Sequence, residues 1–287
     1  MLIDFHTHST ASDGALDPVT LLQRAAERGV DAFAITDHDT VAGYRLARDH
    51  YNEVADCPAL VSGVELSCRW SGTTIHVVGL GMDIDHPTLV EGLQRLEQAR
   101  QDRGHKIGER LEKQGMPGAL AGARAVAGSS QLGRPHFAAW MIAQGHVADA
   151  NEAFDRFLGQ GKIGDVKAFW PDMAEVTAWI VASGGVAVMA HPLKYRYTRT
   201  KLNRLLVDFQ AAGGRAMELI SGPGARSEQR AQLERLAGEL GLLVSAGSDY
   251  HRDGPYAPQL GVESRHLGSF PGVWETLGLA DNASYPE

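Results

Sequence analysis

Short runs of β-branched and other apolar residues alternate along this chain with amphipathic stretches of helical period. The first runs cover residues 2–5, 30–36, 59–66 and 73–80, and amphipathic stretches fill the first two gaps. The same rhythm returns over 171–251. Such alternation is typical of βα units and of a parallel sheet. It predicts an α/β fold of about seven strands, close to the eight of a full (β/α) barrel.

Local signals place helices after several of these runs. Asp17 is expected as the N-cap of a helix that has Pro18 in its first turn and Gly29 just past its end. Further helices are expected over 199–212 and 225–240. Each follows a predicted strand, as a βα unit requires.

The middle of the chain lacks the alternation. A long polar helix is expected over 87–115, and short helices rich in Gly and Ala follow it without a convincing strand. We therefore predict that residues 1–97 and 168–287 form the barrel and that residues 98–167 form a helical cap inserted into it. A cap over the strand ends would set the substrate.

Composition narrows the function classes. The 287 residues are 44% hydrophobic and 22% charged, as in ordinary globular proteins, and the net charge of −8 argues against a protein that binds long duplex DNA. No run approaches the ~18 apolar residues of a membrane span. Cys57 and Cys68 form neither a disulfide framework nor a CxxC pair. These features predict a cytoplasmic protein without a membrane partner.

His6 and His8 lie two residues apart at the end of the first predicted strand. Their side chains should therefore point to the same face and form half of a metal site. Taken alone, the pair is explained equally well by hydrogen bonds to the backbone. Asp13 follows in a Ser-Asp-Gly sequence, where simple turn chemistry is the alternative to metal ligation.

The second and third strands add further candidates. Asp37, His38 and Asp39 follow the second strand; we expect His38 as a ligand, Asp37 as a residue that orients it, and Asp39 as the N-cap of the next helix. Glu65 is expected at the end of the third strand, where a carboxylate is costly unless a cation meets it. His76 lies inside an apolar run and would ordinarily be a hydrogen-bonded core histidine.

The pattern recurs at later strand ends, because His191 follows residues 186–190, and Asp249 and His251 follow residues 242–248. In (β/α) barrels the carboxyl ends of the strands form the active-site face, so these side chains should converge. Imidazole and carboxylate ligands without thiolate suit Mn, Zn or Fe. The candidates imply a shared cluster of two or three ions, and they are His6, His8, Asp13, His38, Glu65, His76, His191, Asp249 and His251.

In order and context, these motifs resemble those of the PHP (polymerase and histidinol phosphatase) family of phosphoesterases. The match covers residues 1 to about 85 and 165 to 255, and none of the nine positions departs from the family pattern. The resemblance implies a distorted (β/α)7 barrel of the PHP type with a trinuclear metal centre.

The resemblance also implies how the ligands are shared. One ion would be held by His6, His8, Glu65 and Asp249. Glu65 would bridge to a second ion, held also by His76 and His191. The third ion would be held by Asp13, His38 and His251. Mn²⁺ is the expected metal, with Zn²⁺ or Fe²⁺ as alternatives.

The physics of such a cluster predicts phosphoester hydrolysis. Two ions lower the pKa of a bridging water enough to supply hydroxide near neutral pH, and they neutralise phosphate oxygens during in-line attack. The third ion would act as a Lewis acid on another phosphate oxygen. Glu65, His191 and Asp249 are predicted to be catalytic as well as ligating.

Two basic segments are candidates for phosphate binding. Arg134 and His136 belong to a Gly-Arg-Pro-His sequence in the insertion, where a guanidinium could clamp a phosphate; an ordinary turn that opens a helix is the alternative. Lys194, Tyr195 and Arg196 follow His191 closely, and cations interleaved with aromatics suit a phosphorylated nucleotide. A solvated loop is the alternative for this second segment.

Lys167 and Trp170 are weaker candidates of the same kind, and Trp170 is expected in the core. The two basic segments resemble the PHP branch that acts on nucleoside 3′,5′-bisphosphates and on the 5′ ends of short RNA. This resemblance implies that the protein removes the 3′-phosphate of such a bisphosphate, with 5′-3′ trimming of short RNA as a candidate second activity. The expected partner is a small phosphorylated nucleotide or short RNA and not duplex DNA; protein partners are not predicted.

Three alternatives stay open. A histidinol-phosphate phosphatase would act on a substrate with a single phosphate and would need fewer basic sites. A metal-dependent amidohydrolase could use a similar barrel without the basic segments. A protein that only holds metal, or serves as a polymerase accessory, would bind ions without turnover.

Overall fold

The structure of the chain is a computed structural model that describes residues 1–167, 169–222, 227–255 and 257–279. In this part of the chain the strands form two sheets. The first has the order β3-β2-β1-β9, with β1 (Leu2–Asp4), β2 (Ala32–Ala34), β3 (Ala59–Val61) and β9 (Val262–Glu263). The second has the order β4-β5-β6-β7-β8, with β4 (Gly63–Trp70), β5 (Thr73–Leu80), β6 (Val186–Met189), β7 (Ala216–Ser221) and β8 (Leu243–Gly247).

The strands are not all parallel. β1, β2 and β3 pair in parallel, as do β6, β7 and β8, but β4 pairs antiparallel with β5, β5 with β6, and β9 with β1. The hairpin between β4 and β5 turns on Ser71 and Gly72, which both have positive φ (46° and 73°), as a tight two-residue hairpin turn requires. The prediction of a parallel sheet is therefore wrong for these strands.

The run 59–66, predicted as one strand, is two strands in different sheets. β3 ends at Val61, and β4 begins at Gly63 and continues to Trp70. Gly63 lies so close to the end of β2 that a Cβ there would be 2.7 Å from the Ile35 carbonyl oxygen. The chain passes from one sheet to the other at this close approach, which only glycine allows.

The two sheets meet at two places. Phe5 N donates to Ala246 O of β8 (3.1 Å), and on the other side Asp39 N donates to Glu65 O of β4 (2.9 Å). The described strand pairings do not close the sheets into one continuous barrel. The structure therefore confirms the predicted α/β class of fold, with strands of mixed direction.

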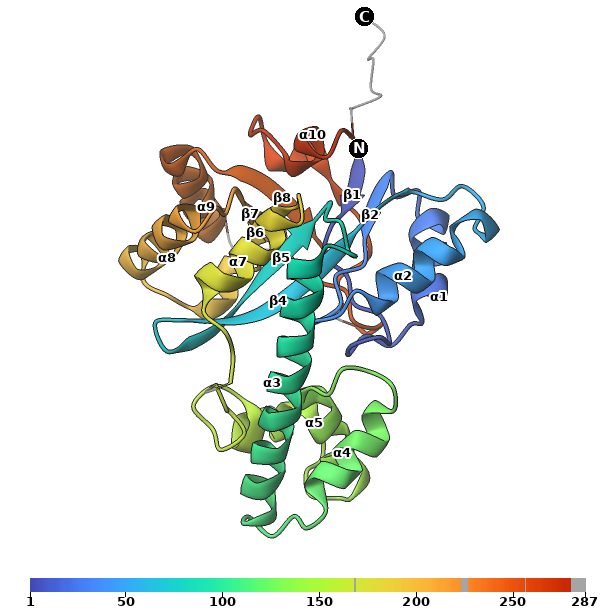
Figure 1. Cartoon of the computed structure of the whole chain (residues 1–287), viewed down its shortest axis with the longest axis vertical. Helices are drawn as coiled ribbons and strands as arrows, with labels where there is room; N and C mark the ends of the chain where they lie inside the picture. Colours follow the sequence, from blue (N-terminus) through green and yellow to red (C-terminus); the bar gives the residue numbers. More distant parts are fainter. Residues whose placement is uncertain (168, 223–226, 256, 280–287) are drawn as a thin grey trace, which may run out of the picture.

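Helices cover the outside of the sheets. Figure 1 shows α1 (Pro18–Glu27) and α2 (Ala42–Asp49) on one side, and α8 (Arg199–Ala211) and α9 (Ser227–Leu240) on the other, with α7 (Met173–Ala182) between α3 and α8. A short helix, α10 (Val273–Thr276), lies near the N-terminus. Of the helix expected at 225–240, the first two residues lie outside the described ranges. Among the described residues no helix is long and apolar enough to cross a bilayer.

The first helix begins as predicted. The Asp17 side chain accepts hydrogen bonds from Val19 N and Thr20 N, both 3.1 Å, and Pro18 is the first helical residue. Gly29, with φ of 69°, follows the end of the helix, where the left-handed conformation favours glycine. These local signals were sufficient because they do not depend on tertiary contacts.

One hydrophobic core lies between the two sheets and the helices α7, α8 and α9. It contains Phe5 near the end of β1, Val64 of β4, Val188 of β6 and Leu205 of α8, and each of these side chains is at most 1% exposed. Burial of each such side chain contributes about 1.5–3 kcal/mol. The shared core holds the two sheets together as one unit.

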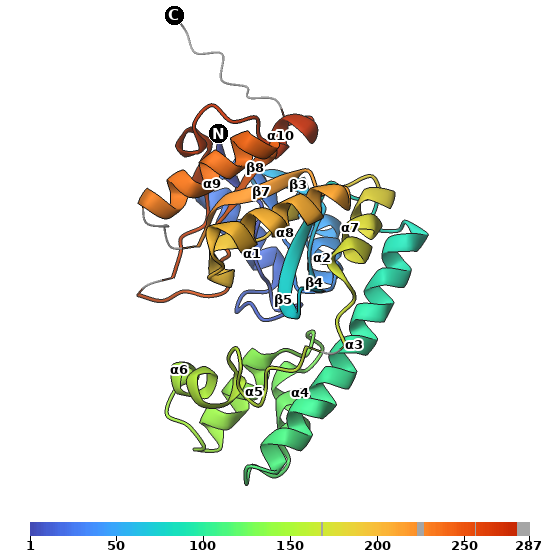
Figure 2. The same cartoon turned by 90° about the vertical axis from the view of Figure 1, so that its left-hand side faces the viewer.

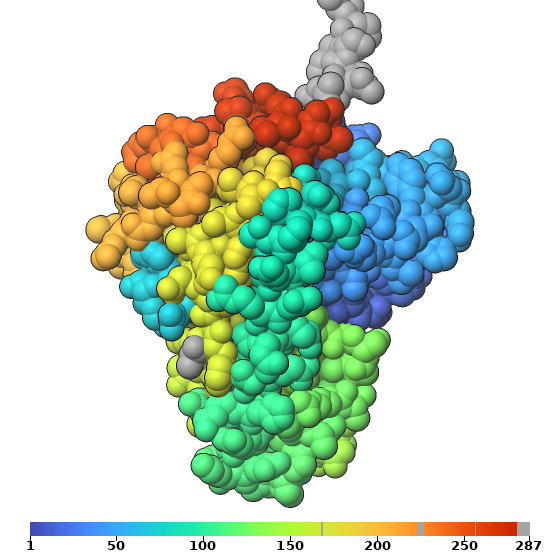
Figure 3. Space-filling view, in the orientation of Figure 1, coloured from blue at the N-terminus to red at the C-terminus, as the bar shows by residue number. Residues whose placement is uncertain are grey.

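Residues 98–167 are all described and contain no strand. They include most of α3 (Pro87–Glu112), with α4 (Ala119–Ala127), α5 (Arg134–Ala143), α6 (Ala150–Ala153) and η2 (Phe154–Leu158). A second core, with Ile107, Phe137 and Met141 among its members, holds them together. Figures 2 and 3 show this helical insertion as a lobe that projects from the sheets, and α3 as the element that runs along both. The predicted boundary at 97/98 falls inside α3.

Candidate metal centre

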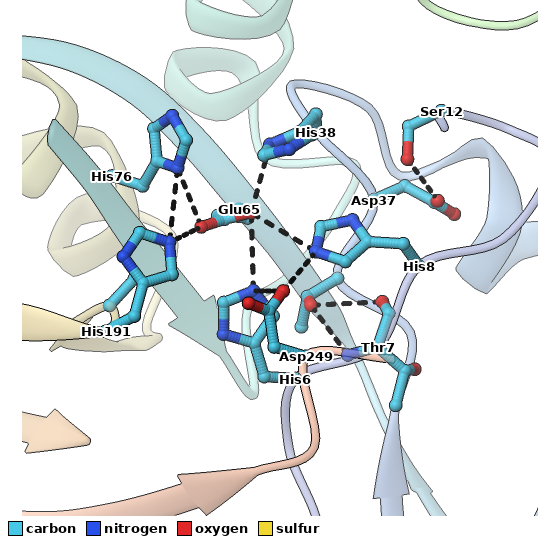
Figure 4. Close-up of polar contacts among 12 residues, drawn as sticks. His6, Thr7, His8, Ser12, Asp37, His38, Glu65, His76, His191 and Asp249 are labelled. Carbon is cyan, nitrogen blue, oxygen red and sulfur yellow. Dashed lines mark hydrogen bonds and ion pairs between the residues drawn. The ribbon is translucent and has the colours of Figure 1, made fainter. Parts of the chain in front are cut away.

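The structure brings together all nine predicted metal ligands. His6 and His8 follow β1, His38 follows β2, His191 follows β6, and Asp249 and His251 follow β8. Glu65 and His76 lie within β4 and β5, and Asp13 lies in the turn after β1. The expectation that Glu65 ends a strand is therefore wrong, because β4 continues past it into the hairpin. Figure 4 shows the side chains that point toward one another around Glu65.

The ligand atoms form overlapping groups in which all atoms lie within 4.8 Å of one another. Two groups contain His6, one with His8 and Asp249 and one with Glu65 and His191. The other two contain His38, one with Glu65 and His76 and one with His8, Asp13 and His251. Because members are shared between groups, ions held here would form a cluster, not separate sites.

Glu65 lies at the centre of the cluster, and its side chain is 1% exposed. Imidazole nitrogens surround its carboxylate at 2.8–3.3 Å, and they belong to His6, His8, His38, His76 and His191. Burial by itself would raise the pKa of Glu65, but these imidazoles lower it well below its usual value. The carboxylate is therefore charged and available to more than one cation.

Several buried polar atoms of the cluster have no hydrogen-bond partner among the described residues. They are His6 Nε2, His8 Nδ1 and Nε2, His38 Nδ1, Glu65 Oε2 and His191 Nδ1. Leaving a buried polar atom unsatisfied costs about 1–3 kcal/mol. Glu65 Oε2 lies 3.0–3.3 Å from His6 Nε2, His8 Nε2 and His38 Nδ1, but none of these contacts has hydrogen-bond geometry. Imidazole nitrogens and carboxylate oxygens arranged this way fit divalent metal ions such as Mn²⁺, Zn²⁺ or Fe²⁺.

The charges of the cluster are strongly coupled. Burial raises the pKa of Asp13 and Asp249, but nearby imidazoles outweigh it and hold both pKa values well below the usual range. The pKa of His8 is raised to about 10, because Asp249 and Glu65 outweigh the effect of burial. Burial instead lowers the pKa of His38 to about 4. The three carboxylates thus stay ionised and require compensating positive charge.

Glu218 on β7 was not predicted, yet it contacts two ligand residues. Its Oε1 accepts from His6 Nδ1 and its Oε2 accepts from His191 N, both at 2.6 Å, and its side chain is 1% exposed. A proton held at His6 Nδ1 leaves Nε2 free to face Glu65 and Asp249. A carboxylate inside an apolar run, the signal that identified Glu65, could have identified Glu218 as well.

Three residues of the site other than glycine have left-handed backbone: Asp39 (φ 56°), His191 (φ 30°) and Asp249 (φ 52°). Such conformations cost about 1–3 kcal/mol each and persist where the surroundings hold them. Glu218 holds the His191 backbone, and Asp249 N donates to His6 O at 2.8 Å. These hydrogen bonds hold the backbone of His191 and Asp249 in the left-handed conformation.

Asp39 is not a helix cap, contrary to the prediction. The residue before α2 is Val41, without a side-chain cap. Asp39 Oδ1 accepts from Ser67 N (2.6 Å), and Oδ2 accepts from Arg100 of α3 (2.6 Å). All of these groups are buried, so Asp39 joins β4 and α3 beside His38.

Asp37 orders the loop that carries Asp13. Its carboxylate accepts from Ser9 N (2.8 Å), Ser9 Oγ (2.6 Å) and Ser12 Oγ (2.7 Å). These bonds fix the chain between His8 and Asp13. Asp37 thus orders the loop between His8 and Asp13, and its role as a residue that orients metal ligands stays a prediction.

A cavity of about 350 Å³ lies between the cluster and the helical insertion. The cluster side is lined by Asp13, His38, His76 and His251. Other lining residues come from β4, β5, the insertion and the segments beside it: Ser67, Thr74, Arg100, Arg103, Gly133, Arg134, Pro135, Phe154, Trp170 and Lys194. The cavity thus combines candidate metal ligands with four cationic side chains.

Two of the predicted substrate contacts line this cavity. Arg134 donates from Nη1 to Leu158 O (3.0 Å), and Lys194 Nζ pairs with Asp249. His136 does not line it; its Nδ1 accepts from Gly133 N (3.0 Å) in the first turn of α5. Trp170 lines the cavity and also belongs to the core, as expected.

Tyr195 and Arg196 also lie outside the lining of the cavity. The Tyr195 hydroxyl accepts from His76 N (2.9 Å) and donates to Ala190 O (3.0 Å), so the fold itself uses this polar group. Arg196 is exposed and has left-handed backbone, with φ of 52°. Lys167, the weaker candidate, pairs with Asp165 at 2.8 Å.

Comparison with known proteins agrees with this geometry. The chain matches the PHP domain family over residues 4–106. It is 42% identical over 272 residues to a protein of Haemophilus influenzae named 5′-3′ exoribonuclease, with 95% of this chain and 97% of the relative covered. It is 38% identical over 253 residues to the 3′,5′-nucleoside bisphosphate phosphatase of Chromobacterium violaceum, with 88% of each covered.

A solved structure resembles the whole chain. It is described as an amidohydrolase from Chromobacterium violaceum with bound sulfate and no metal. The TM-score is 0.86 at 35% sequence identity, and the match covers 97% of this chain and 98% of the other. The similarity therefore includes both the sheets and the helical insertion.

Proposed function

The chain belongs to the PHP domain family and hydrolyses phosphoester bonds, and we propose that it converts nucleoside 3′,5′-bisphosphates to nucleoside 5′-monophosphates. The observation that carries this proposal is the cavity, where Arg103, Arg134 and Lys194 lie with the candidate ligands His38 and His76. A substrate with two phosphates needs positive charge at two places, and this cavity offers both. The name of the relative in Chromobacterium violaceum supports the same substrate class.

The residues fit a metal cluster, and we propose the sharing that the sequence implied. His6, His8, Glu65 and Asp249 would hold one ion, Glu65, His76 and His191 a second, and Asp13, His38 and His251 a third. When bound, divalent ions lower the pKa of coordinated water and neutralise charge on phosphate oxygens. Mn²⁺ is the proposed metal, with Zn²⁺ or Fe²⁺ as alternatives that the same nitrogen and oxygen donors suit.

The side chains of this protein have distinct tasks in that reaction. Glu65, His191 and Asp249 are the proposed catalytic residues, and Glu218 fixes the ring of His6. Lys194, whose ammonium group pairs with Asp249, would contact an oxygen of the reacting phosphate. The insertion, which we propose as a cap over the sheets, limits access of bulk water to the cavity.

A 5′-3′ exoribonuclease activity on short RNA is the second candidate. The observation that favours it is the 42% identity over 95% of this chain to a protein with that name. Both activities hydrolyse a phosphoester of a nucleotide that carries a 5′-phosphate, so one cavity could serve both.

We also propose that the two sheets form one distorted barrel of seven βα-type units. The hydrogen bonds from Phe5 to Ala246 and from Asp39 to Glu65 support this, because they link the sheets on both sides of the cluster. The single core shared by the sheets supports it too.

The test is hydrolysis by the manganese-loaded protein, measured as phosphate released from the phosphate monoesters, nucleoside 5′-monophosphate released from the RNA and amine released from the amide. The substrates are adenosine 3′,5′-bisphosphate, a 5′-phosphorylated RNA trimer, histidinol phosphate and an amide substrate. We expect AMP and phosphate from the bisphosphate with the highest kcat/KM. A higher kcat/KM for histidinol phosphate or for the amide would contradict the proposal, and cleavage of the trimer alone would leave the second candidate.

A further inference from the structure

A row of aromatic rings leads from the ligand cluster toward the surface of the protein. The ring centre of Tyr195 lies 5.5 Å from that of His191, and the ring centre of Tyr197 lies 5.7 Å from that of Tyr195. Trp70 continues the row, with its ring centre 5.8 Å from that of Tyr197. Tyr195, Tyr197 and Trp70, which we call the aromatic row, are each partly exposed. The row therefore connects a candidate metal ligand with solvent.

The aromatic row begins where the wall of the cavity ends. Lys194 and Thr74 line the cavity. Tyr195 follows Lys194 in the chain, and Thr73, the neighbour of Thr74, pairs with Trp70 in the β4–β5 hairpin. Figure 3 shows the tip of this hairpin (cyan) at the surface beside α8 (orange). A polymer that leaves the cavity past Lys194 would thus meet the aromatic row.

Two cations accompany the aromatic row. Lys201 Nζ lies 4.1 Å from the ring centre of Tyr197 and 5.8 Å from that of Trp70, and it has no ion pair with a described residue. Arg196 lies between the two tyrosines in the chain, is exposed, and likewise has no ion pair within the described ranges. The acid beside the row, Asp208, accepts from Trp70 Nε1 (2.8 Å). Aromatic rings accompanied by positive charge are what proteins use to bind single-stranded nucleic acid.

The chemistry of RNA trimming places the rest of the RNA next to this row. Release of a nucleoside 5′-monophosphate breaks the bond between O3′ of the first nucleotide and phosphorus. The oxygen of water bonds to phosphorus, one proton ends on O3′, and the shortened RNA keeps the reacting phosphate at its 5′ end. The downstream strand is therefore attached to the reacting phosphate, which belongs at the ligand cluster beside Lys194.

We propose that the aromatic row, with Arg196 and Lys201, binds the nucleotides downstream of the scissile phosphate of a short single-stranded RNA. This inference rests on the proposed exoribonuclease activity. Arg196 and Lys201 contact backbone phosphates, and the exposed ring surfaces stack with bases, so binding does not depend on base sequence. A nucleoside 3′,5′-bisphosphate has no downstream nucleotide and does not reach the row.

The test compares adenosine 3′,5′-bisphosphate with a 5′-phosphorylated pentaadenylate. The double variant Arg196→Gln/Lys201→Gln should lower kcat/KM for the pentaadenylate by about 4- to 25-fold, as for two exposed ion pairs. For the bisphosphate, kcat/KM should stay within about twofold of the unmodified protein. Tyr197→Leu should also weaken hydrolysis of the pentaadenylate alone, whereas Tyr197→Phe, which keeps the ring, should not.

Salt dependence gives a second readout that a change in the fold would not produce. A pentaadenylate with a fluorophore at its 3′ end is titrated with metal-free protein, and anisotropy gives the Kd over a range of salt concentrations. The slope of log binding constant against log salt should become shallower by about 0.7 for each phosphate contact removed. The double variant should therefore lose about 1.4 of the slope.

The matched control is Lys113→Gln/Arg235→Gln, which changes the net charge by the same amount. Lys113 lies at the end of α3 and Arg235 on α9; both are exposed, and neither has an ion pair with a described residue. This control should change neither the salt slope nor the kcat/KM of either substrate by more than about twofold.

Equal losses on the two substrates would overturn the proposal, because the two cations would then act on the reacting phosphate or on the fold. An unchanged salt slope in the double variant would refute the phosphate contacts. If the pentaadenylate is not hydrolysed but its binding depends on Arg196 and Lys201, the RNA site stands and the exoribonuclease activity is wrong. If it is hydrolysed and both readouts ignore these residues, the activity stands and the RNA site is wrong.

Discussion

Glu218→Gln is the substitution that separates the proposed metal centre from an ordinary network of buried polar groups. Glu218 accepts two hydrogen bonds at 2.6 Å, from His6 Nδ1 and from His191 N. Glutamine has the same size, so packing is unchanged. It provides only one acceptor oxygen, however, while its other end is a donor.

The single oxygen cannot serve both neighbours. The backbone N–H of His191 is always a donor, so the oxygen should face it and the amide nitrogen should face His6. His6 would then accept at Nδ1 and carry its proton at Nε2, the atom that faces Glu65 (3.3 Å) and Asp249 (3.6 Å). A protonated Nε2 cannot ligate a metal ion. Loss of such an orienting partner weakens metal binding by about 10- to 100-fold, which is about 1.4–2.7 kcal/mol.

Two measurements check this. Competition between the protein and a chelating dye gives the Mn²⁺ affinity, and ¹⁵N NMR of the metal-free protein gives the tautomer of His6. Glu234→Gln is the control: Glu234 pairs with Arg230 on α9 (2.9 Å), and neither residue belongs to a ligand group. Unchanged Mn²⁺ affinity and an unchanged His6 tautomer in Glu218→Gln would refute the reasoning.

Three further predictions concern the metal, the backbone of the site and the insertion. Removal of metal from protein that was held with free Mn²⁺ at 100 times its Kd should cost about 2.7 kcal/mol of stability, seen as a Tm lower by roughly 4–5 °C; a Tm that chelator does not change would contradict a metal centre. Gly247→Ala should abolish Mn²⁺ binding or folding, because its Cβ would lie 2.3 Å from His6 Cβ, whereas Gly238→Ala, with no atom nearer than 3.8 Å, should be tolerated; normal metal binding by Gly247→Ala would show that the site can shift. Phe137→Ala should destabilise the insertion by about 3–5 kcal/mol, measured by denaturant unfolding, with Mn²⁺ affinity unchanged because Phe137 belongs to the second core; loss of Mn²⁺ affinity would show that the two parts are coupled.

The convergence of the candidate ligand residues could be predicted because most of them carry a local signal. His6 with His8, and Asp249 with His251, are pairs spaced by two residues after apolar runs, and strand ends on one edge of a sheet meet in space. Glu65 lies at the centre of the cluster, although the prediction that it ends a strand is wrong because β4 continues to Trp70. The passage between the sheets at Gly63 depends on contact with Ile35, which is remote in sequence.

The residues that sequence reasoning missed have their partners far away in the chain. Arg100 and Arg103 belong to a long polar helix, where charged residues ordinarily face solvent. They are 5% and 7% exposed only because α3 packs against Trp170 and Asp39. In the sequence, Glu218 is a single carboxylate in a short predicted strand. Its partners His6 and His191 are 212 and 27 residues away, so only the folded chain shows the contacts.

The buried pair of Arg100 and Asp39 connects the two cores of this protein. Asp39 follows His38 directly and also holds Ser67 of β4, while Arg100 lies one helical turn before Arg103 on α3. Removing one partner of a buried ion pair costs about 3–5 kcal/mol, because the other charge is left unpaired. The pair therefore fixes where α3 lies against the sheets, and with it the separation between the ligand cluster and Arg103. Because this ion pair joins the two charged walls, the cavity is already formed before a substrate binds. Binding then carries no free-energy cost for assembling it.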